Sequence, residues 1–366
     1  MPYSVGIVGL TNAGKSTIFN ALTALQVPCE PYPFCTIDPH RGQVPVPDPR
    51  LDQLAELVNP ERVIPDVIEF VDIAGLVRGA HKGEGLGNQF LAEIRPVDAI
   101  ALVIRCFENP EVAHPEGSIN PLRDLETVFF ELVQKDLETT LRRKEKAEKR
   151  LRVGDKKAQQ ETELCEKMIQ ALEELKPLSE LEFNEEEKKI LNEMKPLTLK
   201  PFFIIANLGE EQIEEAETPY LKELRQYVKD NGFLLVEFYG KIEAEVHELE
   251  KEEQELFLKE MGLKESGLNA VINMGKQVLD LITFFTAVGG KELRSWLIPR
   301  GTSALKSAGR IHSDFEQGFI KAEVISFDDF IRAGGEQGAR KLGLVRVEGK
   351  DYLVQDGDVI HFRFRA

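Results

Sequence analysis

Residues 9–16 have the residue types and spacing that bind a triphosphate. Their sequence, Gly-Leu-Thr-Asn-Ala-Gly-Lys-Ser, fits the pattern G-x-x-x-x-G-K-[ST]. In such a loop the glycines let backbone N–H groups point at phosphate oxygens, and the following helix adds positive potential at its N-terminus. Lys15 would reach the β- and γ-phosphates, and the Ser16 hydroxyl would bind magnesium. An ordinary strand-to-helix turn is the competing interpretation, but the flanking strand and helix patterns favour the phosphate-binding loop.

A second element, Asp-Ile-Ala-Gly at residues 72–75, follows an apolar strand pattern. A carboxylate at this place can hold magnesium through a water, and the Gly75 N–H can contact the γ-phosphate. Between the two elements, Thr36 lies in a proline-rich loop. A threonine there can bind magnesium while the γ-phosphate is present and let go after hydrolysis, although it could also be a plain loop hydroxyl. The expected metal ligands are thus Ser16, Thr36 and, through water, Asp72, and the expected catalytic groups include Lys15 and Gly75.

A third element bears on which base is bound. GTPases read guanine with an N-K-x-D motif, which this sequence lacks, and residues 207–210 are Asn-Leu-Gly-Glu instead. Asn207 takes the place of the motif's asparagine, but leucine replaces its lysine and the longer glutamate replaces its aspartate. The two-bond clamp on guanine is therefore compromised, while Asn207 can still offer its amide to the N6/N7 edge of a purine. The element predicts relaxed or adenine-preferring recognition of the base. The alternative is that residues 207–210 are only a loop that follows a strand.

The residue after Gly75 bears on catalysis. Many GTPases carry a glutamine there to orient the attacking water, and this chain has Leu76, which cannot do so. Hydrolysis must therefore rely on another group or be slow without a partner. His81 and His114 are candidates, and each could equally be a surface histidine of its loop. Asn12 is a candidate ligand for a monovalent cation, and potassium beside the phosphates would act as a built-in positive charge.

Alternating strand and helix patterns must position these groups. Apolar strand patterns occur at residues 5–8, 67–71, 99–104, 202–206 and 234–238, and helical patterns lie between most of them. This alternation predicts an α/β fold, with a mainly parallel sheet and helices on both faces. The stretch 27–49 is rich in proline and polar residues, so we expect an exposed loop with short extended pieces.

Between residues 104 and 202 the alternation is interrupted. Asn120-Pro121 is a typical helix start, and apolar residues then recur at helical spacing on both sides of a break at Gly154-Asp155. We expect two long antiparallel helices that form an inserted arm, although a pair of packed surface helices would give the same pattern. After residue 279, several short strand patterns predict a small α+β domain. The expected division is a nucleotide-binding domain of residues 1–121 and 196–278, an arm of 122–195 and a terminal domain of 279–366.

Composition narrows the class of protein. The 366 residues include 63 acidic and 46 basic ones, a net charge of −17, which argues against a chain that coats nucleic acid with its whole surface. The length favours two or three domains. No apolar run has membrane-spanning length, and the N-terminus lacks the basic segment of a signal peptide. We therefore expect no membrane contact. Because the four cysteines are scattered without metal-ligand spacing, we expect a reduced, cytoplasmic protein; they are Cys29, Cys35, Cys106 and Cys165.

These motifs closely resemble those of the YchF-type Obg-like ATPases, a branch of the P-loop GTPases related to translation factors. The resemblance spans essentially the whole chain. Its most specific parts are Val-Gly-Ile-Val-Gly-Leu-Thr-Asn-Ala-Gly-Lys-Ser-Thr at 5–17, Pro-Phe-Cys-Thr-Ile-Asp-Pro at 33–39, and residues 70–89 with Gly-Glu-Gly-Leu-Gly-Asn. The element at 207–210 also agrees with the family's N-x-x-E. The resemblance implies a P-loop G-domain sheet, an inserted coiled-coil arm and a C-terminal domain similar to TGS domains, which have a β-grasp fold.

The resemblance also implies activity and site residues. It implies that ATP is preferred over GTP, that intrinsic hydrolysis is slow and that the protein associates with the ribosome. His114 matches a loop histidine suspected of a catalytic role in the family. One departure is that residues 238–241 read Phe-Tyr-Gly-Lys, without the usual serine-alanine pair beside the base. The nucleotide-binding residues implied by position are Asn12, Ala13, Gly14, Lys15, Ser16 and Thr17 for the phosphates, and Asn207, Leu208 and Glu210 for the base.

The expected end of the arm is strongly basic. Residues 141–160 carry nine basic and three acidic side chains, whereas residues 161–195 hold eleven glutamates and five lysines. A solvated helix surface would also explain such a charge run. We expect the end of the arm to touch phosphates of ribosomal RNA, with four candidate contacts: Arg142, Arg143, Arg150 and Lys156.

Taken together, the sequence predicts a ribosome-associated hydrolase that binds magnesium-ATP, and GTP less well, as a conformational switch in translation or stress regulation. The arm and the terminal domain would contact the ribosome. One alternative is a translational GTPase that prefers GTP. A second is a binding module gated by nucleotide, in which hydrolysis is incidental. A third is a stress or redox regulator that acts through Cys35, the neighbour of Thr36.

Overall fold

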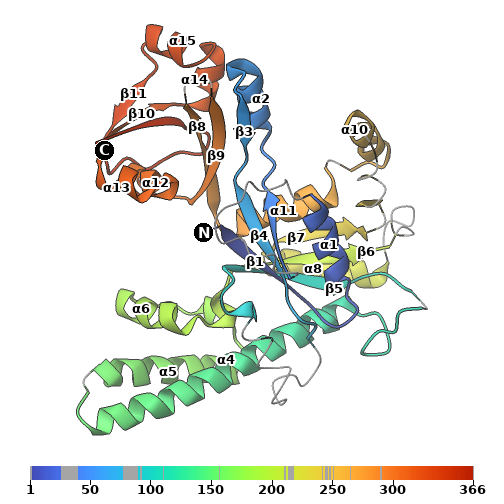
Figure 1. The fold of residues 1–366 in the computed structure, drawn as a ribbon. Helices are drawn as coiled ribbons and strands as arrows, with labels where there is room; N and C mark the ends of the chain where they lie inside the picture. Colours follow the sequence, from blue (N-terminus) through green and yellow to red (C-terminus); the bar gives the residue numbers. More distant parts are fainter. Residues whose placement is uncertain are drawn as a thin grey trace.

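Two six-stranded β-sheets with their covering helices and a long helical hairpin make up the described part of the chain (Figure 1). The expectations for Thr36, His81, Lys156 and Glu210, and for Cys29 and Cys35, concern residues outside those that the structure describes, so they stay predictions. The computed structural model describes residues 2–25, 40–76, 90, 93–109, 111–155, 157–209, 212, 218–240, 242–243, 246, 249, 251–263, 265–288 and 291–365.

The first sheet contains the strands that the apolar patterns predict. Its order is β2-β4-β1-β5-β6-β7, and its neighbouring strands are parallel except for β2, which runs antiparallel to β4. Because parallel strands end at one edge, the residues after β1, β4, β5 and β6 come together there. The strands are β1 (Tyr3–Val8), β2 (Arg41–Pro45), β4 (Val67–Asp72), β5 (Ala99–Arg105), β6 (Phe202–Leu208) and β7 (Leu235–Tyr239).

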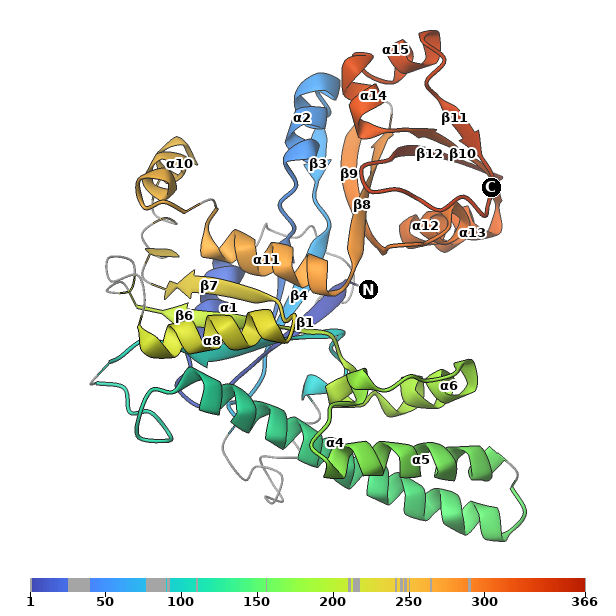
Figure 2. The same ribbon diagram turned by 180° about the vertical axis from the view of Figure 1, so that it is seen from behind.

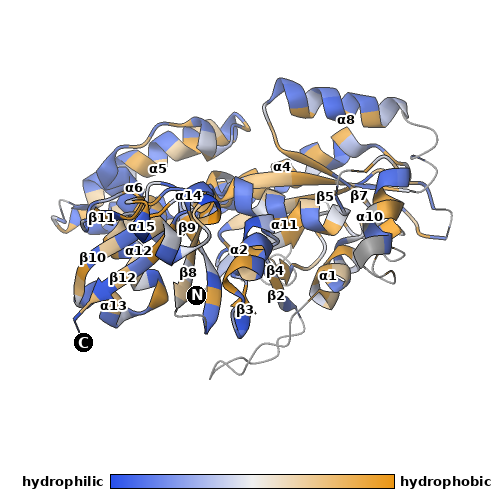
Figure 3. Ribbon diagram, turned by 90° about the horizontal axis from the view of Figure 1, so that it is seen from above, coloured by the Kyte–Doolittle hydropathy of each residue, from blue (hydrophilic) through white to orange (hydrophobic). Residues whose placement is uncertain are grey.

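Helices cover both faces of this sheet, as the alternation predicts. All seven residues of β5 are buried, which is typical of a strand covered on both sides. One face packs against α1 (Lys15–Ala24) and α11 (Gly267–Val278), and the other against α4 (Pro121–Arg152) and α8 (Pro219–Asp230). The outer surface of α8 is largely hydrophilic (Figure 3). A further helix, α10 (Lys251–Glu260), lies to one side.

The long helix α4 carries the arm. Asn120 caps its N-terminus by accepting a hydrogen bond from the Arg123 N–H at 3.0 Å, and proline takes the first helical position, as expected. The helix extends beyond the sheet, and α5 (Lys157–Glu173) returns beside it (Figure 2). Within the described ranges, no helix is both long and apolar enough to cross a membrane. The chain returns to β6 through η2 (Leu178–Glu180), α6 (Glu185–Met194) and η3 (Leu197–Leu199).

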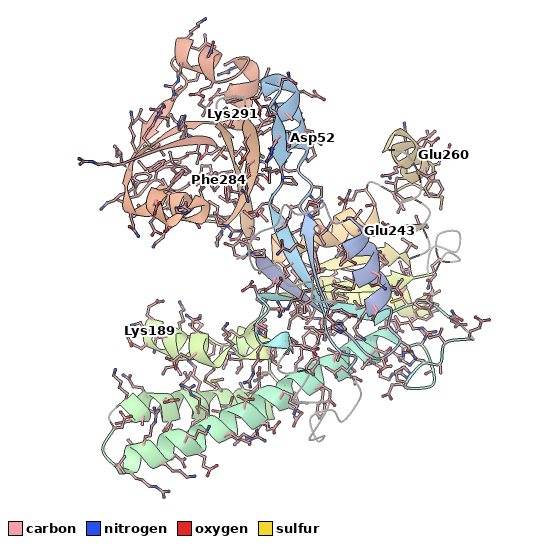
Figure 4. The ribbon with its side chains drawn as sticks, viewed as in Figure 1. Asp52, Lys189, Glu243, Glu260, Phe284 and Lys291 are labelled. Carbon is pink, nitrogen blue, oxygen red and sulfur yellow. The ribbon has the colours of Figure 1, made fainter. Side chains whose placement is uncertain are left out.

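The second sheet belongs to the C-terminal part, where short strands were predicted. Its order is β11-β10-β12-β8-β9-β3, and Phe284 lies inside its core (Figure 4), 6.3 Å from Trp296 between ring centroids. The strands are β8 (Leu281–Val288), β9 (Glu292–Pro299), β10 (Phe319–Ile325), β11 (Arg346–Glu348) and β12 (Val359–Phe364). One face is covered by α12 (Ala304–Ile311) and α13 (Ser313–Gln317), the other by α2 (Pro49–Val58), α14 (Phe327–Arg332) and α15 (Glu336–Lys341).

One strand and one helix of this second unit come from the N-terminal part of the chain. The strand β3 (Arg62–Ile64) pairs in parallel with β9, and α2 packs Leu51 and Leu54 into the same core. The expected domain of residues 1–121 therefore needs a correction, because residues 49–64 pack with the terminal domain. Three residues are too few for a recognisable strand pattern, which is why β3 was missed.

A buried carboxylate links the two units. Asp66, between β3 and β4, accepts a hydrogen bond from the Leu297 N–H at 2.7 Å and one from the Arg310 guanidinium at 3.3 Å. Its own N–H donates to the Ser295 hydroxyl at 2.8 Å. Because a buried carboxylate is costly without such donors, these bonds fix where β4 leaves the second unit and enters the first sheet.

A second buried carboxylate, Asp136, fixes the root of the arm and supplies a test of the fold. It accepts hydrogen bonds from the N–H groups of Leu197 and Thr198, both at 2.8 Å, and from the Thr198 hydroxyl at 2.7 Å. Asp136→Ala leaves these buried donors without an acceptor, so we expect the free energy of unfolding to fall by about 2–4 kcal/mol. Urea unfolding measures this fall. The matched change at the exposed Asp314 should leave stability unaltered, and equal stability of both variants would contradict the assignment.

Candidate nucleotide-binding site

The predicted phosphate-binding loop joins β1 to α1 at the edge of the first sheet where the parallel strands end. Gly14 has a φ of 98°, in the left-handed region, immediately before α1 begins. A Cβ atom on Gly14 would overlap the Asn207 side chain, and one on Gly9 would overlap the Val103 carbonyl. The two glycines of the motif are therefore required by close neighbours, and at Gly14 also by the backbone conformation.

Lys15 points into this loop. Its side-chain ammonium donates to the Leu10 carbonyl at 2.9 Å, and the residue is only 7% exposed. Desolvation lowers the pKa of Lys15, and the negative charge of Asp72 partly opposes this effect. A positive charge held in this way is suited to bind the oxygens of a phosphate.

The two described candidate magnesium ligands face each other. Ser16 donates its hydroxyl to Asp72 Oδ2 at 2.9 Å, and the backbone N–H of Asp72 donates to the His40 carbonyl at 2.9 Å. A hydroxyl and a carboxylate oxygen are the kinds of ligand that magnesium prefers. The donor set of Ser16 and Asp72 thus fits this metal.

The loop after β4 is tied to the phosphate-binding loop. The Leu76 N–H donates to the Gly9 carbonyl at 3.1 Å, and the Thr11 N–H donates to the Leu76 carbonyl at 3.3 Å. A Cβ atom on Gly75 would lie 3.2 Å from Lys15 Nζ, so the predicted γ-phosphate contact and the lysine lie side by side. The Leu76 side chain is buried in the core, which agrees with the expectation that it does not orient water.

The base-recognition element comes close to the same loop. Asn207 donates its side-chain N–H to the Ala13 carbonyl at 3.0 Å, and a Cβ on Gly240 would lie 4.0 Å from its oxygen, Oδ1. The residue after β7 therefore borders this oxygen although the serine-alanine pair is missing. Leu208 is buried in the core on the α4 and α8 side, so only its backbone is placed to border a base.

Asn12 connects the phosphate-binding loop to the segment after β5. It adopts a positive φ of 64°, and its side-chain N–H donates to the Ala113 carbonyl at 3.0 Å. The buried Arg105 shapes the same segment by donating to the carbonyls of Phe107 at 3.1 Å and Val112 at 3.0 Å. The side-chain nitrogen of Asn12 is used in the bond to Ala113, and its side-chain oxygen is the atom that could bind a cation.

His114, the neighbour of Ala113, has both ring nitrogens hydrogen-bonded in this conformation, so it cannot bind a water. Its Nδ1 accepts the Glu116 N–H at 3.1 Å, so Nε2 carries the proton and donates to Asp124 Oδ2 at 2.8 Å. Both ring nitrogens are engaged, and the side chain is 6% exposed. His114 would have to leave Asp124, in the first turn of α4, before it could bind a water.

Two polar residues of this edge were missed by the sequence analysis. Glu93 accepts the Ala74 N–H at 3.1 Å and so supports the loop that contains Gly75. Gln212 is buried and bonds to Gly209 just beyond Asn207. Neither residue belongs to a motif, so no sequence signal pointed to them.

The basic residues of the arm have two different roles. Arg143 and Arg150 on α4 both bind Glu161 on α5, so they hold the two helices together. Arg142, by contrast, is 72% exposed and pairs only along its own helix, with Glu138 at 2.6 Å, among the described residues. Beside them lies a groove of about 720 Å³ lined by Arg95, Glu138, Thr139, Arg142, Arg143, Lys146, Arg150, Glu161, Glu193 and Met194.

Comparison with known proteins gives full-length matches. Residues 4–149 match a family model described as a 50S ribosome-binding GTPase, and residues 281–365 match the C-terminal model of YchF GTPases, described as a protein of unknown function. A Haemophilus ducreyi protein named ribosome-binding ATPase YchF is 51% identical over 366 residues, covering all of both chains. A Bacillus subtilis protein of the same name is 46% identical, also over all of both chains.

Solved structures show the same relationship. The YchF GTPase of Schizosaccharomyces pombe superposes with a TM-score of 0.86 at 35% identity, over 99% of this chain and 97% of that chain. A GTP binding protein of Pyrococcus horikoshii, with a TM-score of 0.58 at 19% identity over 99% of this chain and 100% of that chain, shares the fold. Because these matches extend over the P-loop sheet, the helical arm and the second sheet, the chain belongs to the YchF family.

Proposed function

We propose that this chain is a magnesium-dependent ATPase that associates with the ribosome and acts as a conformational switch in translation or stress regulation. The observation that carries the proposal is the meeting of Lys15, Ser16 and Asp72 at one sheet edge, beside Gly75. The names of the relatives, ribosome-binding ATPase, support ATP as the substrate and the ribosome as the partner. A ribosomal partner implies a cytoplasmic location.

Transfer of a phosphoryl group to water needs positioning and charge stabilisation more than covalent chemistry. Lys15 would offset charge on the β- and γ-phosphate oxygens, because its ammonium already lies at the loop and is largely desolvated. Ser16 directly, and Asp72 through water, would hold magnesium, with Thr36 as a further ligand. Bound magnesium would supply positive charge against the developing charge of the phosphates. The Gly75 N–H would donate to the γ-phosphate.

Hydrolysis by the isolated protein should be slow. The Leu76 side chain lies in the core, and His114 is bonded to Asp124, so neither is placed to orient a water. We therefore propose that His114 acts only after its loop rearranges. The oxygen of Asn12 would help to hold potassium beside the phosphates, because its amide nitrogen is already bonded to Ala113.

Adenine fits the base edge better than guanine does. One N–H of the Asn207 amide donates to the Ala13 carbonyl, which fixes the orientation of the side chain, and Oδ1 can accept a hydrogen bond. The N6 amino group of adenine is a donor, whereas guanine has an acceptor oxygen at the corresponding position. Glu210 completes the predicted base contacts, and Leu208 would contribute through its backbone.

The exposed basic side chains of the arm would contact phosphates of ribosomal RNA. Arg143 and Arg150 join the two helices through Glu161, so they are less suited to phosphate than Arg142, Lys146 and Lys149, which are exposed on α4. Within the described part of the chain, Arg142 and Lys149 pair only with glutamates of the same helix. Lys156 remains a candidate. The terminal domain would form a second contact with the ribosome.

Lys15→Ala should abolish ATP turnover, because it removes the ammonium that would bind the β- and γ-phosphates. Steady-state phosphate release measures this, in potassium and in sodium buffers, and the wild type should turn over faster in potassium. Lys306→Ala, at an exposed lysine of α12, is the control and should behave as the wild type. Full activity of Lys15→Ala would contradict the site, and equal rates in both salts would contradict the potassium role.

The wild type should bind ATP more tightly than GTP, because Asn207 Oδ1 can accept from adenine N6. Calorimetric titration of the nucleotide-free protein with each nucleotide, in magnesium, measures the two dissociation constants. Tighter binding of GTP would instead support a GTP-preferring translational GTPase.

Reversing charge at Arg142, Lys146 and Lys149 to glutamate should weaken cosedimentation with ribosomes and reduce its dependence on salt. A matched control reverses Lys188 and Lys189, which are exposed on α6 among glutamates, and should cosediment like the wild type. Unchanged cosedimentation of the arm variant at low salt would show that the arm does not contact RNA.

A further inference from the structure

Gln212 is a polar side chain buried at the end of β6, with 4% exposure. Its oxygen, Oε1, accepts the Gly209 N–H at 2.6 Å, and its nitrogen donates to the Cys106 carbonyl and to the Tyr220 hydroxyl, the latter at 3.1 Å. The Tyr220 hydroxyl donates in turn to the same carbonyl at 3.3 Å. Buried amides usually have partners at both ends, and here the partners belong to three separate segments of the chain.

These bonds hold residues 207–209 against the end of β5. The Cys106 N–H donates to the Asn207 carbonyl at 2.8 Å, so one end of this short stretch is anchored by Cys106 directly. The other end, at Gly209, is anchored to the Cys106 carbonyl through Gln212. The Asn207 side chain extends from this stretch to the phosphate-binding loop at Ala13. The place of Asn207 Oδ1 relative to a bound triphosphate therefore depends on both anchors.

We propose that Gln212 is a positioning residue that determines nucleobase specificity. It clamps residues 207–209 onto Cys106, and the clamp sets the distance from Asn207 Oδ1 to the base of a nucleotide held by the phosphate-binding loop. Gln212 itself touches no base. This inference rests on the proposed function, because it needs Asn207 to contact the base.

Apart from the bond from Asn207 to the Ala13 carbonyl, the phosphate contacts have anchors outside this clamp. They come from the loop between β1 and α1 and from Lys15, which have their own anchors at Leu10, Gly9 and Leu76. Replacing Gln212 by methionine keeps the length of the side chain but removes its hydrogen bonds. The Gly209 N–H then loses its acceptor, and residues 207–209 can shift. Binding of the base should weaken more than binding of the phosphates, since the phosphates are expected at the loop between β1 and α1 and the base at residues 207–209.

The experiment titrates three probes, each with magnesium, by calorimetry: ATP, GTP and inorganic triphosphate. In Gln212→Met the dissociation constant for ATP should rise about tenfold, that for GTP should rise less, and that for triphosphate should not change. In steady state the change should fall on KM for ATP and not on kcat. Gln226→Met, at an exposed glutamine of α8, is the matched control and should bind all three probes like the wild type.

Tyr220→Phe provides a second, milder variant. It keeps the bond between Gln212 and Gly209 but removes the hydroxyl that supports the Gln212 nitrogen. The dissociation constant for ATP should therefore lie between those of the wild type and Gln212→Met. This variant tests the clamp even if Gln212→Met does not fold.

Two results would overturn the inference alone. One is that both variants keep the wild-type preference for ATP over GTP and over triphosphate. The other is that Gln212→Met weakens ATP and triphosphate equally, which would make Gln212 a general support of the fold. If the wild type itself binds ATP no more tightly than triphosphate, base recognition in the proposed function fails, and the inference fails with it.

Discussion

At the edge of the first sheet, the Lys15 ammonium is kept almost entirely out of solvent and donates to the Leu10 carbonyl. Burial of an ammonium is unfavourable unless opposite charge and hydrogen-bond acceptors compensate it, and desolvation accordingly lowers the pKa of Lys15. The Asp72 carboxylate opposes that shift. A triphosphate would supply the remaining acceptors, so the site is arranged for an anion that completes it. The glycines, the parallel strand ends and the loop after β4 all serve to hold this lysine in place.

The phosphate-binding loop also connects distant parts of the chain. Ala13 accepts from Asn207 of the base element, and Asn12 donates to Ala113, whose neighbour His114 is bonded to the first turn of α4. On the other side, β4 carries Asp72 at one end and continues at the other end from β3, a strand of the second sheet. A change at the phosphates therefore has direct covalent or hydrogen-bonded routes to the base element, to the first turn of α4 and to the C-terminal unit.

Motifs whose chemistry is local could be predicted from the sequence. The phosphate-binding loop, the loop after β4 and the Asn120 cap each depend on neighbouring residues, and the structure places them as expected. Features that depend on distant partners could not be predicted. The strand β3 is defined by its pairing with β9, which is distant in the sequence. The role of Gln212 depends on its hydrogen bonds to Cys106 and Tyr220, which are also distant. Likewise, the local sequence of Arg143 and Arg150, two of the expected RNA contacts, does not reveal their pairing with Glu161 on the returning helix.

In the proposed function, this edge of the sheet hydrolyses ATP and the arm contacts the ribosome. The most direct test is the steady-state rate of ATP and GTP hydrolysis by the full chain, measured with and without ribosomes in magnesium and potassium. We expect slow ATP hydrolysis by the protein alone and lower rates with GTP throughout. Hydrolysis should be faster with ribosomes, because the loop of His114 is bonded to the first turn of α4, the helix that carries the arm. Hydrolysis of GTP faster than that of ATP, together with no response to ribosomes, would contradict the proposed function.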